Sequence, residues 1–93
     1  MTSTSEPVWR KATIVNDLGL HARAAAKLAK TAQAAKNKVW LKFGSDRVDA
    51  KQVIDIMTLG AAKGDQVSVG IEQVEDLGIM KAIVELFASG FGE

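Results

Sequence analysis

Hydrophobic and polar residues alternate in two short stretches of the chain. Residues 39–43 alternate valine, leucine and phenylalanine with tryptophan and lysine, and residues 67–71 place serine and glycine between valines and an isoleucine. A side-chain period of two predicts a half-buried strand in both places. Residues 8–15 are rich in Val, Ile and Thr and predict another strand. Residues 44–46 (Gly-Ser-Asp) predict a tight turn into a short return strand at 47–50.

Three further stretches predict helices. Residues 22–35 consist mostly of Ala, Lys and Leu, which are strong helix formers. Residues 51–59 predict a short helix that Gly60 ends. Glu75 or Asp76 caps a last helix, whose buried face carries Met80, Ile83, Val84 and Phe87. The order β-α-β-β-α-β-α predicts an α+β domain with its helices packed on one face of a sheet.

Composition narrows the class of protein. The 93 residues suffice for one domain over 1–93, in which we expect 1–6 to be a flexible tail. Absence of cysteine excludes disulfides and thiolate metal sites, and a single histidine excludes a histidine-rich zinc site, so we expect neither metal nor other cofactor. The beginning of the chain lacks a signal-like apolar run and no stretch is long enough to span a membrane, which predicts a cytoplasmic protein without membrane insertion.

The strongest candidate for chemistry is the only histidine, His21. It follows turn residues, Asn-Asp-Leu-Gly at 16–19, and directly precedes the alanine-rich helix. The first N–H groups of a helix lack intrahelical partners and attract anions, and Arg23 adds donors suited to phosphate. We interpret His21 as a residue that carries a phosphoryl group. The alternative from position alone is a solvated histidine that caps a helix.

Positively charged side chains lie near the N-terminus of this helix, where the helix dipole is also positive. Arg23, Lys27 and Lys30 follow a helical spacing and share one face. Cations are unfavourable near a helix N-terminus, so an anion or an acidic partner would compensate them. Solvation of a surface helix explains the two lysines equally well, but it explains Arg23 poorly.

The short helix at 51–59 has more apolar residues than one buried stripe can hold. Five of its residues are large and apolar: Val53, Ile54, Ile56, Met57 and Leu59. Either the helix is buried all round, or some of these residues form an exposed patch of the kind that binds other proteins. Methionine suits a surface that repacks against several partners.

Taken together, these residues resemble HPr, the histidine-containing phosphocarrier family of the bacterial phosphotransferase system. The specific motif is Gly-Leu-His-Ala-Arg at 19–23, and a weaker one is Ala-Lys at 50–51 followed by Leu-Gly-Ala at 59–61. The resemblance extends from about residue 8 to residue 87. It implies an HPr-like open-faced sandwich, in which a four-stranded antiparallel sheet carries three helices on one face. The hydrophobic pattern alone does not distinguish this arrangement from a ferredoxin-like order of strands.

The resemblance also implies a function. His21 would accept a phosphoryl group through Nδ1, Arg23 would stabilise it, and the backbone amide of Ala22 would hold its oxygens. Enzyme I would donate the group, ultimately from phosphoenolpyruvate, and an enzyme IIA-type protein would receive it for sugar uptake or regulation. The chain would therefore be a carrier, not an autonomous enzyme. The sequence does not fix its oligomeric state, and we take a monomer as the default. The implied docking surface consists of Ala22, Lys27, Lys30, Val53, Ile54 and Met57.

Two positions depart from the family pattern. Ala24 stands where the family often has proline, which leaves one more amide free in the first helical turn. Gln52 stands where some members carry a serine that a regulatory kinase phosphorylates. Glutamine cannot accept a phosphoryl group, so we predict that this chain lacks that regulatory input.

Three alternatives to a sugar-branch carrier follow from the same residues. One is a non-catalytic docking module in which His21 is incidental. Another is a nitrogen-branch phosphocarrier paralogue, whose partner choice Asp55 would shift by its charge. The third is a small nucleic-acid-binding domain, but the net charge of +1 disfavours it. We therefore expect no nucleic acid as partner and interpret Trp9 and Trp40 as structural residues.

Overall fold

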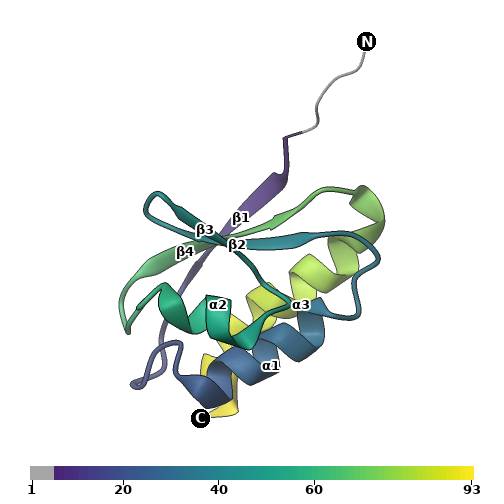
Figure 1. Cartoon of the computed structure of the whole chain (residues 1–93). Coiled ribbons are helices and arrows are strands. Elements are labelled where there is room, and N and C mark those ends of the chain that lie inside the picture. Colours follow the sequence, from purple (N-terminus) through teal and green to yellow (C-terminus); the bar gives the residue numbers. More distant parts are fainter. Residues whose placement is uncertain (1–5) are drawn as a thin grey trace.

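The computed structural model describes residues 6–93 and folds them into one sheet with helices below it (Figure 1). The tail predicted at 1–6 lies outside the described residues except for Glu6, which is exposed. The elements in chain order are β1 (Val8–Thr13), α1 (Ala22–Ala32), β2 (Val39–Phe43), β3 (Asp46–Asp49), α2 (Val53–Thr58), β4 (Gln66–Ile71), η1 (Val74–Asp76), α3 (Leu77–Ala88) and η2 (Gly90–Gly92).

The sheet has four strands in the order β1-β4-β2-β3, and every pair is antiparallel. The helices all lie on one face (Figure 1), and the strands point their buried side chains toward them. The opposite face has no helix over it. The α+β class, the four-stranded antiparallel sheet and the three helices on one face are confirmed.

Small side chains let α1 approach the rest of the core closely. Its buried face carries four alanines and Leu28, while its lysines stay exposed. Helix α1 packs against both α2 and α3. Helix α3 buries Met80, Ile83 and Phe87, whereas Val84 is only partly buried. The core therefore lies between one sheet face and three amphipathic helices.

The predicted boundaries of two elements need correction. Helix α1 ends at Ala32, three residues before the predicted end, and β1 ends at Thr13 rather than at residue 15. The chain after α1 is held by Asp76, whose carboxylate accepts hydrogen bonds from the backbone N–H groups of Lys36 and Asn37, both at 2.9 Å. Because Asp76 is only 2% exposed, these contacts compensate the loss of its hydration. Its side chain is committed to them and does not cap α3, contrary to the prediction.

Candidate functional site

A glycine turn positions His21 at the beginning of α1. Gly19 has φ +64°, and a Cβ added there would lie 2.8 Å from the carbonyl oxygen of Ala61. Glycine is therefore required both by its backbone angle and by this close approach. The N–H of Leu20 donates to the same carbonyl at 3.2 Å. These contacts fix the loop against the segment before β4 and set where the histidine begins the helix.

His21 is the N-cap residue of α1, as predicted, and its two ring nitrogens have different partners. Nδ1 accepts from the backbone N–H of Arg23 at 3.4 Å, while Nε2 lies 2.5 Å from Oε2 of Glu93. The Arg23 amide can only donate and an ionised carboxylate can only accept. These partners assign the proton of the neutral imidazole to Nε2. The lone pair of Nδ1 thus points to the helix N-terminus.

Glu93 is held in place by two side chains, His21 and Asn16. Nδ2 of Asn16 donates to Oε1 of Glu93 at 3.1 Å and to the carbonyl of Gly19 at 2.8 Å. Burial opposes the ionisation of Glu93, but hydrogen bonds from His21 and Asn16, together with nearby positive charge, outweigh it and lower its pKa. Glu93 is therefore a carboxylate across the neutral pH range.

The segment Gly90–Gly92 folds back onto the core and brings Glu93 to the histidine. Phe91 is buried, and its ring packs edge-on against Phe87 with the centroids 5.0 Å apart. Nζ of Lys27 donates to the carbonyl oxygen of Phe91 at 2.6 Å. Lys27 thus anchors this turn as well as contributing charge to the surface.

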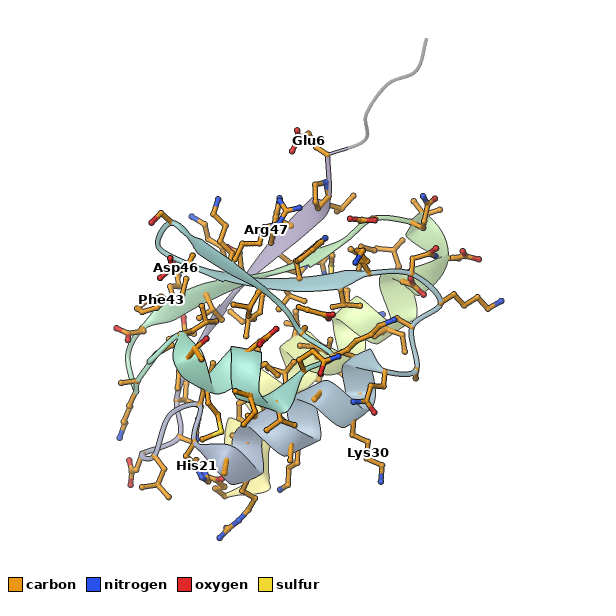
Figure 2. The ribbon with its side chains drawn as sticks, viewed as in Figure 1. Glu6, His21, Lys30, Phe43, Asp46 and Arg47 are labelled. Atoms are coloured by element: carbon orange, nitrogen blue, oxygen red, sulfur yellow. The ribbon has the colours of Figure 1, made fainter. Side chains whose placement is uncertain are left out.

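Neither Glu93 nor Phe91 was predicted as part of the site. The contact between His21 and Glu93 joins residues 72 positions apart, and no local pattern in the sequence indicates it. Asn16 lay within the turn that sequence analysis recognised, but its bond to Glu93 depends on the tertiary fold. Figure 2 shows His21 beside the beginning of α1, the end of the molecule at which the chain terminates in Figure 1.

The remaining polar groups at the helix start favour an anion. The first turn of α1 contains no acidic residue, and Arg23 and Lys30 are exposed. Among the hydrogen bonds of residues 6–93, none uses the N–H groups of Ala22 and Ala24 as donors. An unbonded amide on exposed Ala22, a helix N-terminus and the exposed Arg23 two residues after His21 form a setting suited to a phosphoryl group.

The short helix α2 divides its apolar residues between the core and the surface. Ile56 and Leu59 are buried and Val53 is partly buried, whereas Ile54 is 71% and Met57 39% exposed. Of the two alternatives for this helix, the structure therefore shows the exposed patch. Because α2 packs against α1, the patch lies on the helical layer that also carries His21 (Figure 1). Gln52 is the exposed N-cap residue of α2 and makes no side-chain capping bond.

Neither a metal site nor a membrane-spanning helix occurs in the part of the chain that the structure describes. Residues 6–93 contain no group of three or more His, Cys, Asp and Glu side chains that could hold a metal ion. No helix within them is long and apolar enough to cross a membrane.

Fold and site together define a class: a small α+β domain that presents one histidine nitrogen at a helix N-terminus beside an exposed apolar patch. Residues 8–89 match the family model described as the PTS HPr component phosphorylation site. The chain belongs to the HPr family, the phosphocarriers of the phosphotransferase system.

Individual relatives agree with this assignment. The chain is 38% identical over 80 residues to the phosphocarrier protein HPr of Neisseria meningitidis, covering 86% of this chain and 90% of that protein. It is 41% identical over 85 residues to HPr of Pseudomonas putida, covering 90% and 94%. A crystal structure of HPr-C-His from Thermoanaerobacter tengcongensis superposes with a TM-score of 0.86 at 35% identity, covering 92% of this chain and 97% of the other.

Proposed function

We propose that Nδ1 of His21 accepts a phosphoryl group from enzyme I and passes it to an enzyme IIA-type protein. The observation that supports this most directly is the division of roles on the ring. Glu93 holds Nε2–H, so the electron pair of the ring lies on Nδ1, where it accepts only the 3.4 Å bond from the N–H of Arg23. Phosphoryl transfer depends mainly on positioning and charge stabilisation, and both are present here.

In the proposed step, the Nδ1 lone pair attacks the phosphorus of the donor's phosphohistidine. The new N–P bond forms as the donor's N–P bond breaks, and the donor ring keeps that electron pair. The His21 ring gains positive charge while Nε2 keeps its proton, and the Glu93 carboxylate at 2.5 Å stabilises this charge. A second transfer of the same kind, in which the N–P bond at His21 breaks, delivers the group to the receiver.

The phosphoryl oxygens would bind the amide of Ala22 and the guanidinium of Arg23, both on exposed residues of the first helical turn. Ala24 is fully buried, so the amide that it has in place of the family's proline would not reach the group. All the donors lie at a solvent-accessible helix end. Such a site holds the phosphoryl group in transit without enclosing it, as transfer to a receiver requires.

We propose that donor and receiver use one docking surface, formed by Ala22, Lys30, Val53, Ile54 and Met57 with Lys27 at its edge. Its centre is apolar and its border is basic, which suits a small, transient interface with an acidic partner. Lys27 takes part less freely than predicted, because it is bonded to Phe91. We place these encounters in the cytoplasm, where phosphoenolpyruvate is available to enzyme I.

The test is intact mass after incubation with phosphoenolpyruvate, magnesium and bacterial enzyme I. We expect one acid-labile phosphoryl group on the wild type and none on His21→Ala, with unchanged circular dichroism showing that the variant folds. Addition of an enzyme IIA protein should then remove the group. If the wild type takes up no phosphate even from its own organism's enzyme I, while both proteins bind a partner equally, the protein is a docking module instead.

A further inference from the structure

Both tryptophans lie on the sheet face that no helix covers. Trp9 of β1 and Trp40 of β2 are each in register with Gly70 of β4, so the three residues form one row across the sheet. A Cβ at Gly70 would lie 2.6 Å from Cζ3 of Trp9. The missing side chain therefore lets the Trp9 ring lie close over the backbone of β4. Together, the Trp9 and Trp40 rings form an apolar aromatic surface on this part of the sheet.

Cations surround the two rings. The Arg47 guanidinium carbon lies 4.4 Å from the Trp40 centroid and 5.6 Å from that of Trp9. Nζ of Lys42 lies 5.6 Å from the Trp9 centroid, and Nζ of Lys38 lies 5.4 Å from that of Trp40. The register places one more cation, Lys11, in the row that contains Lys42 and Arg47. We call these residues (Trp9, Lys11, Lys38, Trp40, Lys42 and Arg47) the outer sheet surface.

Two acidic side chains lie close to this surface, and each accepts a hydrogen bond from a neutral donor. Glu72 accepts a hydrogen bond from Nε1 of Trp40 at 2.9 Å, and Asp49 accepts one from the backbone N–H of Lys51 at 2.9 Å. The outer sheet surface therefore carries four cations against these two acidic side chains, a local excess of positive charge, although the whole chain has a net charge of only +1. The expectation of no nucleic acid as partner rested on the low net charge. Net charge does not show that cations gather on one face of the sheet.

We propose that the outer sheet surface binds single-stranded nucleic acid. Unpaired bases stack on the indoles, and phosphates pair with the surrounding lysines, which is how sequence-tolerant single-strand sites are built. The flexible Arg47 and Lys42 side chains move aside or cover the second face of a stacked base. An acidic polypeptide would use the cations but not the aromatic rings. A second copy of the chain would set four cations against four.

The outer sheet surface and the phosphoryl site lie on different sides of the molecule. In Figure 2, Arg47 lies on the sheet side away from the helices, whereas His21 lies below the helical layer at the beginning of α1. Binding at one site therefore leaves the other open. The proposal does not depend on phosphorylation, and His21→Ala should bind nucleic acid as the wild type does.

The chain's own fluorescence reports on this surface, because it contains two tryptophans and no tyrosine. We would titrate the full chain with an oligothymidylate of about 12 nucleotides, within the range of known single-strand site sizes. We expect saturable quenching. Four displaced counterions on a single strand give a slope of about −3 in log K against log salt, or about 50-fold weaker binding at 200 mM than at 50 mM salt.

Matched charge variants and a second polyanion complete the test, with anisotropy of a labelled oligonucleotide as readout. Lys42→Gln/Arg47→Gln should weaken binding at least tenfold, whereas Lys30→Gln/Lys81→Gln, with the same change of charge on the helices, should change it less than twofold. Trp9→Leu should weaken it about fivefold or more through lost stacking. Equal effects of the two double variants, equal affinity for polyglutamate, or no quenching of the wild type would each overturn the proposal. The charge variants decide the matter if Trp9→Leu fails to fold.

Discussion

Replacement of Glu93 by glutamine tests whether the carboxylate positions His21 for phosphoryl transfer. Glutamine preserves the shape of the side chain but removes its charge. In the wild type, Nε2–H of His21 donates to a carboxylate at 2.5 Å, and Asn16 holds the second oxygen at 3.1 Å. Hydrogen bonds to a charged acceptor are roughly twice as strong as neutral ones. An amide at this position can also turn its NH₂ toward Nε2, which would favour the tautomer with the proton on Nδ1.

We expect Glu93→Gln to slow phosphoryl uptake from enzyme I by at least about tenfold, the effect typical of losing the group that orients a functional histidine. The rate is measured by quenched-flow mass spectrometry at saturating enzyme I. Imidazole ¹⁵N chemical shifts, which differ for the two tautomers, give a second readout: the Nε2–H form in the wild type and a mixture in the variant. Glu85→Gln serves as control, because Glu85 is an exposed acid on α3.

The pH dependence follows from the lowered pKa of Glu93. Burial raises the pKa of Glu93. The hydrogen bonds from His21 and Asn16 and the charges of His21 and Arg23 lower it by more, so the net shift is downward. The carboxylate contact is therefore fully present above the ordinary glutamate pKa of about 4.3 and is lost only as the pH falls through the lower folded value. Titration of Glu93 itself should thus add no pH dependence to the rate ratio of wild type to variant between about pH 6 and pH 8. A ratio within twofold of one, or an equal loss in Glu85→Gln, would refute the positioning role.

Three further outcomes are expected. Asp76→Asn should lower the free energy of unfolding by about 2 kcal/mol in urea titrations, because a buried charged acceptor of two backbone N–H groups is lost. Since the pKa of Asp76 is lowered in the folded protein, this difference should shrink only at acidic pH. The control Glu75→Gln should show no such loss. Gly19→Ala should destabilise the protein by about 1–3 kcal/mol through its left-handed φ and its contact with a carbonyl, as thermal unfolding would show. Ile54→Glu should raise the KM for enzyme I severalfold without unfolding the protein, whereas an equal change at Val74, 72% exposed outside the proposed docking surface, should leave it unchanged.

Much of the fold was predictable because the signals were local. Alternation of apolar and polar residues predicted β2 and β4, because burial of one strand face imposes a period of two. The high alanine content predicted α1. The order of the strands was not predictable from such patterns, and it came from the resemblance to a family. The end of α1 was missed because the N–H of Lys36, which would donate to the carbonyl of Ala32 in a longer helix, donates to Asp76, a side chain far along the sequence. Helix propensity carries no information about such a tertiary contact.

The candidate site, like the fold, has a part that local sequence signals predicted and a part that depends on tertiary contacts. His21 and Arg23 were predictable from turn chemistry next to a helix start, and the exposed part of α2 was foreseen as one of two alternatives. Glu93 was not predictable, because its place depends on Phe91 reaching the core and on the Gly90–Gly92 turn. The cationic surface around Trp9 and Trp40 was also missed, since the cations come from three different strands. Composition averages over the surface, and only the register brings these side chains together.

The proposed phosphoryl carriage would place opposed demands on His21, and the structure separates them on the two sides of its ring. On the Nε2 side, Glu93 fixes the ring through a contact that Asn16, Lys27 and Phe91 support. On the Nδ1 side, the partners are backbone amides at a solvent-accessible helix end, which a phosphoryl group can gain and leave without rearranging the core. Rigidity on one side provides orientation, and openness on the other allows exchange between partners. Tighter enclosure of Nδ1 would improve binding of the group but would slow its release.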